Sequence, residues 1–292
     1  MELLVNILIN GLVAGGIYAL LAIGFALIFG VGRILNMSHT AFYMLTGFLV
    51  FIATSLLGLP LLLSTIMAIV ISSLVGVGCY KLFIDRVREH ETAVIIVTVA
   101  LALLFQEIFL LAFSGQYRGV PSFISGFAEI AGNRISYQHL IAIATSVVTL
   151  IGVWLLLSKT KLGNAIRAVA QDREIASLMG IDVSQICMIT MGISITIAGV
   201  AASVSASIYL VSPLMWMHPL VIILAAVVLG GLGSLKGSIF GAFLLGFAET
   251  AVVFLIQEGG FLKGSISLSV MVLVMLLKPE GLFGVVFEEE RL

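Results

Sequence analysis

Charged residues are scarce in this 292-residue sequence, and their scarcity excludes several classes of protein. Asp, Glu, Lys and Arg make up only 10% of the chain, against about a quarter of an ordinary soluble domain. Fourteen basic and 15 acidic residues are too few to cover the surface of a soluble domain of this size, so most side chains must face lipid or one another. The formal net charge of −1 argues against a nucleic-acid partner.

Cysteine pairs, metal-ligand clusters and nucleotide-binding motifs are lacking as well. Cys79 and Cys187 do not have the spacing of a zinc site or of a disulfide framework. No second ligand stands at metal-binding spacing from His39, so we expect no metal site. No stretch matches the GxxxxGK[ST] pattern of a P-loop, and no nucleophile is recognisably paired with a base. We therefore expect neither an enzyme nor a cofactor bound by this chain.

Hydrophobic residues, in contrast, form long runs. They make up 61% of the chain, and the mean hydropathy is +1.25. A helix needs about 20 apolar residues to cross a bilayer. Charges divide the chain into apolar blocks, and the two longest, residues 34–80 and 183–235, must each hold two spans. The sequence predicts one all-α polytopic membrane domain over residues 1–292, with about eight or nine spans.

The distribution of Lys and Arg predicts how these spans are oriented, because cytoplasmic loops carry the excess of both. Basic residues cluster at positions 81–88 and, more strongly, at positions 159–173. The interval 115–138 has few and is rich in Gly, Pro and Ser, which suits an external loop. This alternation places the amino terminus outside, and the lysines at 236 and 278 with the EEERL tail inside.

A polar stretch, GRILNMSHTAF at residues 32–42, interrupts two long apolar runs. It predicts a break between helices, where freed backbone groups must meet protein or water. Asn36, Ser38 and His39 are placed to bond those groups or a passing solute. The alternative is that the three residues form a cytoplasmic turn after Arg33.

A second break is predicted within residues 226–247. Gly230, Gly231 and Gly233 would each destabilise a helix by about 1 kcal/mol relative to Ala, so a continuous helix is not expected through them. The apolar piece before them, residues 220–229, is too short to span. Paired, glycine-interrupted apolar segments in the two halves of a transporter are the pattern expected around a substrate pathway.

Two carboxylates, Glu107 and Glu249, lie inside apolar runs. An unpaired charge there costs at least about 2.5 kcal/mol, so each needs a partner, water or a proton. A proton relay is one interpretation of this pair. We favour the other, a carboxyl hydrogen-bonded between helices or lying close to an interface, because a proton-coupled transporter should show several such groups.

The segment 159–185 is the least membrane-like part of the chain. Its sequence predicts a short helix over residues 163–170 and a second one that Asp172 caps and Gly180 closes. In the second helix the three apolar side chains Ile175, Leu178 and Met179 share one face, with Arg173, Glu174 and Ser177 pointing away. Such an apolar face can lie on the membrane, pack under the spans or fit a groove on a cytoplasmic partner.

Three motifs resemble those of branched-chain amino acid ABC permeases of the LivH type. LGNAIRAVAQDREIASLMGI resembles the cytoplasmic loop of that family, VVLGGLGSLKGSIFGAFLLGFAE its glycine-rich segment with the following Glu, and KPEGLFG its ending. The first break resembles the family's Asn-Phe-Ala-His-Gly motif at Asn36 and His39 but departs from it at Met37, Ser38 and Thr40. The similarity runs in the same order from Gly11 to Gly284.

The resemblance implies a fold similar to permeases of type II ABC importers and a location in the cytoplasmic membrane of a bacterium or archaeon. It also implies partners: a second permease of the LivM type or a second copy, two ATPases that bind ATP and Mg²⁺, and a periplasmic or lipid-anchored binding protein that delivers Leu, Ile or Val. By motif, the ATPase-coupling loop contains Gly163, Arg167, Ala168, Asp172, Ala176 and Gly180. The residues near the pathway are Asn36, Ser38, His39, Gly230, Gly231 and Gly233. An ion- or proton-coupled secondary transporter of small amphipathic solutes is the alternative.

Overall fold

The protein is a bundle of membrane-length helices. The computed structural model describes residues 2–130, 132–278 and 281–283. The EEERL tail, and part of the KPEGLFG motif, lie outside these residues. The helices are α1 (Glu2–Gly32), α2 (His39–Phe51), α3 (Leu61–Cys79), α4 (Glu91–Phe113), α5 (Tyr137–Lys159), α6 (Lys161–Gln171), α7 (Arg173–Leu178), α8 (Val183–Ala206), α9 (Met217–Gly230), α10 (Leu235–Leu255) and α11 (Lys263–Leu277).

Eight helical segments in the described part of the chain are long and apolar enough to cross a membrane. Two of them are extended by π-helical turns, Ile52–Leu56 after α2 and Tyr80–Ile84 after α3. A 3₁₀ turn, Gly259–Leu262, leads into α11. α9 is an apolar helix of only 14 residues and is too short to cross alone. The expectation of an all-α protein with about eight or nine membrane-spanning segments is confirmed.

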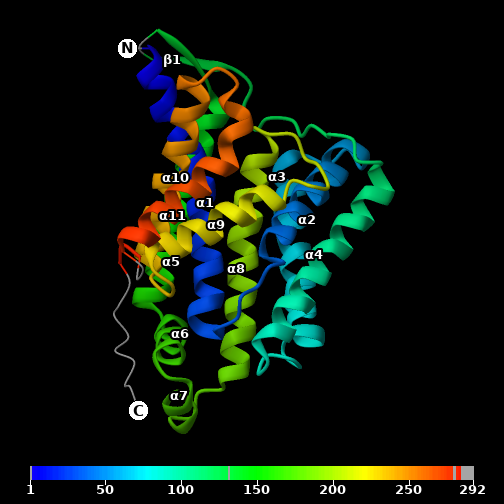
Figure 1. Ribbon diagram of the computed structural model, residues 1–292. Helices are drawn as coiled ribbons and strands as arrows, with labels where there is room; N and C mark the ends of the chain where they lie inside the picture. Colours follow the sequence, from blue (N-terminus) through cyan, green and yellow to red (C-terminus); the bar gives the residue numbers. More distant parts are fainter. Residues whose placement is uncertain (1, 131, 279–280, 284–292) are drawn as a thin grey trace.

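The two ends of the bundle differ in structure (Figure 1). At one end, the strands β1 (Phe127–Ile130) and β2 (Asn133–Ser136) form an antiparallel hairpin. Asn6 Nδ2 donates to Asn133 Oδ1 at 3.1 Å, which holds this hairpin beside the start of α1. The short helices α6 and α7 lie at the opposite end. The amino terminus and the segment 115–138 therefore share one end, as the distribution of charge predicts.

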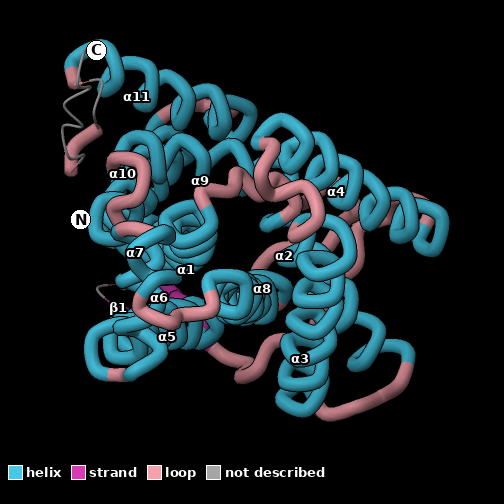
Figure 2. The backbone as a smooth tube through the Cα atoms, turned by 90° about the horizontal axis from the view of Figure 1, so that it is seen from below, coloured by secondary structure: helices cyan, strands magenta, loops and turns pink. Residues whose placement is uncertain are grey.

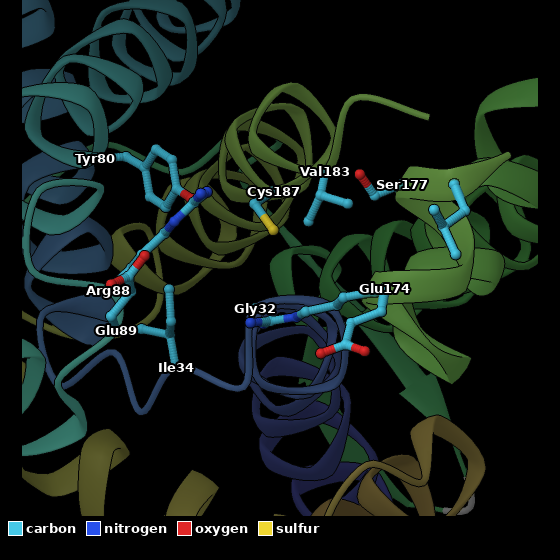
Figure 3. Close-up of a pocket in the computed structure, with 11 residues that line it drawn as sticks. Gly32, Ile34, Tyr80, Arg88, Glu89, Glu174, Ser177, Val183 and Cys187 are labelled. Carbon is cyan, nitrogen blue, oxygen red and sulfur yellow. The ribbon is translucent and has the colours of Figure 1, made fainter. Parts of the chain in front are cut away.

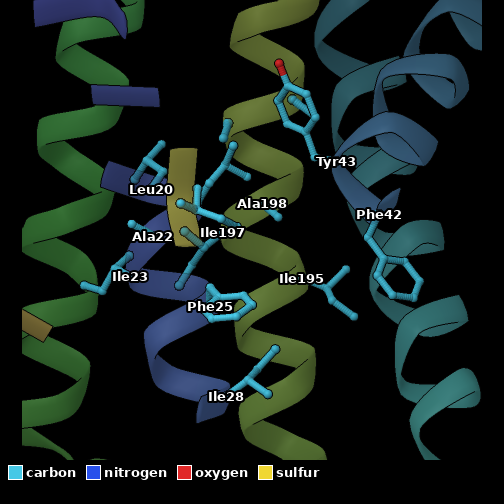
Figure 4. Close-up of a cluster of buried hydrophobic side chains, with 14 of the residues drawn as sticks. Leu20, Ala22, Ile23, Phe25, Ile28, Phe42, Tyr43, Ile195, Ile197 and Ala198 are labelled. Carbon is cyan, nitrogen blue, oxygen red and sulfur yellow. The ribbon is translucent and has the colours of Figure 1, made fainter. Parts of the chain in front are cut away.

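α1 and α8 form the centre of the bundle. Figure 4 shows Phe25 and Ile28 of α1 beside α8, with Ile195 on the opposite side of α8, toward Phe42 of α2. Seen from the α7 end in Figure 2, α3, α4 and α11 lie toward the outside. These outer helices expose many large apolar side chains, which suits a surface facing lipid.

Close helix crossings depend on small residues at a few positions. A Cβ on Gly15 would overlap Phe243 of α10, and one on Gly246 of α10 would overlap the backbone at Gly15. The run of small residues at 199–207 lies on α8 and just after it, and most of its members are buried in the bundle. Small residues thus permit close packing in lipid, where the hydrophobic effect does not drive helices together.

Candidate functional site

The first helix break lies inside the protein. α1 ends at Gly32, Arg33 takes a positive φ of 44°, and α2 begins at His39. Asn36 is 1% exposed, and Ser38 and His39 are fully buried. The chain between the two helices turns back into the bundle beside α8 (Figure 1). This burial favours the prediction that the three side chains bond freed backbone groups or a solute over the alternative of a simple turn in the cytoplasm.

His39 connects α2 to α1 and α8. Its Nε2 lies 3.1 Å from the carbonyl oxygen of Leu21. Because a carbonyl only accepts, the ring carries its proton on Nε2. Its Nδ1 lies 3.4 Å from Ser194 Oγ, and that hydroxyl donates to the carbonyl of Gly24 at 2.7 Å. The carbonyls of Leu21 and Gly24 both belong to α1, so this cluster ties three helices together.

Asn36 and Ser38 close the turn itself. Asn36 Oδ1 accepts from the backbone N–H of Ser38 at 3.1 Å and from its hydroxyl at 2.6 Å. Asn36 Nδ2 lies 3.5 Å from Met191 Sδ on α8. Each of the three polar side chains predicted here therefore has a protein partner. We call this cluster, Asn36, Ser38, His39 and Ser194, the His39 network.

The second break is held by backbone contacts. α9 ends at Gly230 and α10 begins at Leu235, so the predicted interruption is present. A Cβ on Gly230 would overlap the backbone of Gly237, which makes glycine necessary for the close approach of α9 and α10. Gly231 and Gly233 take positive φ values of 96° and 88°, which other residues rarely adopt.

The last carbonyls of α9 are also occupied. Leu282 donates its N–H to the carbonyl of Leu229 at 2.8 Å, and Phe283 donates to that of Gly230 at 3.1 Å. Two cavities lie elsewhere in the bundle, one beside Glu249 and one beside α7. Their walls include none of the residues predicted at the two breaks, which are Asn36, Ser38, His39, Gly230, Gly231 and Gly233. Their assignment to the neighbourhood of the pathway stays a prediction.

Glu249 lies at the centre of a polar cluster between four helices. Tyr18 of α1 donates its hydroxyl to Glu249 Oε2 at 3.0 Å, and Ser267 of α11 donates to Oε1 at 2.7 Å. His218, at the start of α9, places Nε2 3.5 Å from Oε1. Glu249 exposes 2% of its surface. Its carboxyl group bonds to side chains from other helices, in agreement with the interpretation of a carboxyl hydrogen-bonded between helices.

This cluster opens on a cavity of about 520 Å³, which we call the Glu249 cavity. Its wall comes from α1, α2, the end of α8, the segment 207–216, α9, α10 and the start of α11. Tyr43 and Ser205, whose hydroxyls lie 2.5 Å apart, contribute another polar part of the wall. The remaining wall is mainly apolar.

Glu107 has a different environment. It is exposed on the outer surface of α4, where Gln106 Nε2 donates to its Oε1 at 3.3 Å. Gln106 itself is buried and accepts from Trp216 Nε1 at 2.9 Å. Glu107 lies within the last two turns of α4, near the hairpin end. The two carboxylates that the sequence grouped together are therefore not part of one site.

The helices α6 and α7 form as the sequence predicts. Asp172 caps α7 by accepting from the N–H of Ile175 at 2.9 Å, and Gly180 follows with a φ of +83°. Thr160 caps α6 at Gly163, and Gly163 lies so close to the backbone of α5 that a Cβ would overlap it. Ile175, Leu178 and Met179 expose 59%, 86% and 78% of their surface.

Arg173 points away from the apolar face, toward the bundle. Its Nη2 and Nε donate to the carbonyl of Val31 at 2.8 and 3.1 Å. Val31 belongs to the last turn of α1, whose carbonyls lack helical partners, so a guanidinium with several donors is well suited to bind there. Ala176, on the same helix, is buried.

A second cavity, of about 530 Å³, lies between the end of α1, the start of α8 and α7 (Figure 3). Arg88, Glu89, Arg173 and Glu174 give it a charged lining. α7 therefore lies beside an opening at this end of the bundle. In residues 2–130, 132–278 and 281–283, no three His, Cys, Asp or Glu side chains come close enough together to hold a metal ion.

Sequence reasoning missed the partners of Glu249. Tyr18 and His218 carry no motif, and they lie 231 and 31 positions away from it along the chain. The available signal was the short apolar helix that includes His218 and Pro219 in its first turn, because a half-helix that begins inside a bundle brings polar groups to membrane depth.

Comparison with known proteins agrees with the motifs. Residues 7–278 match the model of the family described as branched-chain amino acid transport system / permease component. The chain is 29% identical to the high-affinity branched-chain amino acid transport system permease protein BraD of Pseudomonas aeruginosa, over 95% of this chain and 94% of that one. It is 27% identical to LivH of Escherichia coli, over 94% of each chain. It is also 27% identical to a probable LivH of Methanocaldococcus jannaschii, over 96% of this chain and 92% of that one.

Among solved structures, the fold is similar to PsaBC from Streptococcus pneumoniae in complex with Fab. The TM-score is 0.55 at 18% sequence identity, over 96% of this chain and 93% of that chain. This likeness supports the helical architecture alone. Together with the family match over most of the sequence, it identifies a multi-pass membrane protein. The chain belongs to the family of permease components of branched-chain amino acid transport systems.

Proposed function

We propose that this permease component forms half of an import pathway for Leu, Ile or Val in the cytoplasmic membrane of a bacterium or archaeon. The other half is a second permease of the LivM type or a second copy of this chain. Two ATPases bind at the α7 end, and a binding protein delivers the amino acid at the hairpin end. The family match and the exposed apolar face of α7 support this arrangement.

The apolar face of α7 carries the proposal. Ile175 and Leu178 are exposed on this helix of six residues, and Met179, which caps its end, is exposed beside them. A helix this short has little stability of its own. It is held by its cap at Asp172 and by Arg173. An apolar face on such an element fits a groove on a partner, as in other helix-in-groove contacts.

The contacts that α6 and α7 make with α5 and α1 would transmit a movement of α7 to the bundle. Gly163 packs against the backbone of α5, and Arg173 bonds to the last turn of α1. Arg167 and Ala168 lie between these two anchors on α6, and Arg167 Nη2 donates to Asn164 Oδ1 at 2.7 Å. A displacement of α7 by an ATPase would therefore be transmitted to α1, the helix at the centre of the bundle.

We also place the two helix breaks near the pathway. At each break a helix ends inside the bundle, and packed elements of this kind change between discrete arrangements rather than bending continuously. Asn36, Ser38 and His39 would hold one arrangement of the first break, and Gly230, Gly231 and Gly233 would allow the second to turn. Closure of the ATPases would shift these arrangements and open the route alternately to each side.

The test is ATP-dependent uptake of radiolabelled L-leucine into proteoliposomes that contain the chain and its co-purified subunits. Leu178→Glu places a charge on the proposed docking face, and we expect it to lower uptake at least about tenfold, since charges are depleted from the centres of interfaces. The matched control is Leu178→Met, which keeps an apolar side chain of similar size at this exposed position. It should leave uptake unchanged.

Three results would count against this proposal. Unchanged uptake with Leu178→Glu would remove α7 from the docking surface. Equal losses with Leu178→Glu and Leu178→Met would show that the loss does not come from the added charge. Uptake that ignores ATP and collapses with the proton gradient would favour a secondary transporter.

A further inference from the structure

The Glu249 cavity contains charged groups of both signs beside an apolar wall. At about 520 Å³ it lies in the range of small-molecule sites, about 300–1,000 Å³. Its lining residues include one acidic residue, Glu249, and one basic residue, Lys263. Ile17, Met215 and Val253 contribute apolar surface to it. Few cavities inside a membrane protein carry such a combination, because each charge there must be compensated.

Within the part of the chain that the structure describes, Glu249 has no Lys or Arg as an ion-pair partner. The groups that face it are the neutral hydroxyls of Tyr18 and Ser267 and the imidazole of His218. His218 Nε2 is buried without a hydrogen bond, 3.5 Å from the carboxylate. Two hydroxyl donors satisfy part of the hydrogen-bonding capacity of a carboxylate, which can accept about four hydrogen bonds, and they do not neutralise its charge. A ligand with an ammonium group would supply both the missing donors and the charge.

Lys263 lies at a suitable distance for the other end of such a ligand. It stands four residues before Ser267 on α11, so the two share one face of the helix, about 6 Å apart along its axis. Ser267 bonds to Glu249, which sets Lys263 about one helical turn from the carboxylate, toward the start of α11. Tyr209, which also lines the cavity, adds a hydroxyl.

From this juxtaposition we infer that the Glu249 cavity is a binding site for a zwitterionic amino acid with an apolar side chain. Glu249 binds the ammonium group, Lys263 binds the carboxylate, and the wall formed by Ile17, Met215 and Val253 receives the side chain. The inference rests on the proposed function and makes it more specific, because it assigns to this chain its own contacts with the transported molecule.

Equilibrium binding separates the two charge contacts. The chain, purified with its accompanying subunits in lipid nanodiscs and without the binding protein, is titrated with radiolabelled L-leucine. The competitors are 4-methylpentanoate, which lacks the ammonium group, and leucinamide, which lacks the carboxylate. Glu249→Gln keeps the shape of the side chain and removes its charge. Lys263→Met is a second variant at the edge of the site, and Glu107→Gln is the matched control on the outer face of α4.

We expect Glu249→Gln to weaken leucine binding at least about tenfold while the weak competition by 4-methylpentanoate changes less than about threefold. Lys263→Met should weaken leucine binding and leave leucinamide binding unchanged. Glu107→Gln should stay within about twofold of the unaltered chain. If Glu249→Gln does not assemble, as gel filtration would show, the Lys263→Met result decides.

The inference is overturned if Glu249→Gln and Glu107→Gln bind leucine alike, or if Glu249→Gln weakens leucine and 4-methylpentanoate equally. It is also overturned if the unaltered assembly imports leucine with ATP but binds none directly at millimolar concentration. In each of these cases the proposed function stands. Absence of ATP-dependent leucine uptake by the unaltered assembly would instead reject the proposed function.

Discussion

The His39 network and the Glu249 cavity are two polar clusters in one apolar bundle, and both use α1. In the first, His39 bonds to the carbonyl of Leu21 and Ser194 to that of Gly24. In the second, Tyr18, one turn earlier on the same helix, donates to Glu249. The His39 network is fully buried and lines neither cavity, whereas the Glu249 cluster borders an open volume.

The difference shows how burial of a polar residue relates to its role. Polar groups inside a membrane protein are costly unless they are paired. Where other protein groups bond to each polar side chain and no cavity adjoins them, the cluster fixes the positions of helices. Where a charged group faces a cavity and can still accept or donate further hydrogen bonds, the cluster can bind a ligand. The same apolar surroundings therefore support a structural role in one place and a binding role in another.

Among the substitutions that test this comparison, His39→Ala is expected to lower the stability of the protein most. The substitution removes a buried imidazole, leaves a cavity beside Phe25 and loses the contacts to Leu21 and Ser194. We expect a loss of about 2–4 kcal/mol in the free energy of unfolding. Thermal unfolding of the purified protein in detergent measures it.

His90→Ala is the control for this change, because His90 is exposed at the start of α4 and its side chain makes no capping hydrogen bond. Its effect should stay within about 0.5 kcal/mol. A His39→Ala protein as stable as the His90→Ala protein, but defective in leucine binding, would break the comparison and make the His39 network a binding site.

Much of the fold could be predicted from the sequence because bilayer thickness and hydropathy set span lengths directly. The caps are equally local: Asp172 and Gly180 mark the ends of α7 through chemistry within a few residues. Gly230, Gly231 and Gly233 likewise predict the end of α9 from the sequence around them. Each of these predictions depends on neighbours in the chain, and each is confirmed.

The candidate site was harder to predict because its contacts join distant parts of the chain. Nothing near Glu249 in the sequence indicates that Tyr18 and His218 face it. The pattern of α7 alone gave no partner for Arg173, since the carbonyl of Val31 that it binds lies 142 residues away. Glu107 and Glu249 look alike in sequence, yet only the packing of the bundle places one outside and the other inside.

Ser194→Ala is expected to lower the stability of the protein less than His39→Ala does. It removes the hydroxyl that donates to Gly24 and leaves the imidazole of His39 in place. Interhelical hydrogen bonds in membranes contribute about 0.6 kcal/mol on average and up to about 1.7, so we expect a loss in this range by thermal unfolding. Ser73→Ala is the matched control, since Ser73 bonds to Thr196 on an exposed face. If Ser194→Ala lowered the free energy of unfolding as much as His39→Ala, the hydroxyl rather than the imidazole would be the main stabilising group of the His39 network.

The smallest effect is expected for Ser267→Ala in the Glu249 cavity, and its sign in the binding assay distinguishes the two clusters. Stability should fall by only about 0.6 kcal/mol, because Tyr18 still donates to the carboxylate. Oε1 loses its hydroxyl donor at 2.7 Å and keeps its charge, so it can accept more strongly from a ligand ammonium group. Leucine should therefore bind about twofold more tightly to Ser267→Ala and with unchanged affinity to Ser194→Ala. A leucine affinity reduced equally in both variants would contradict the division between a closed network and an open site, because both serines would then act through the shape of the bundle.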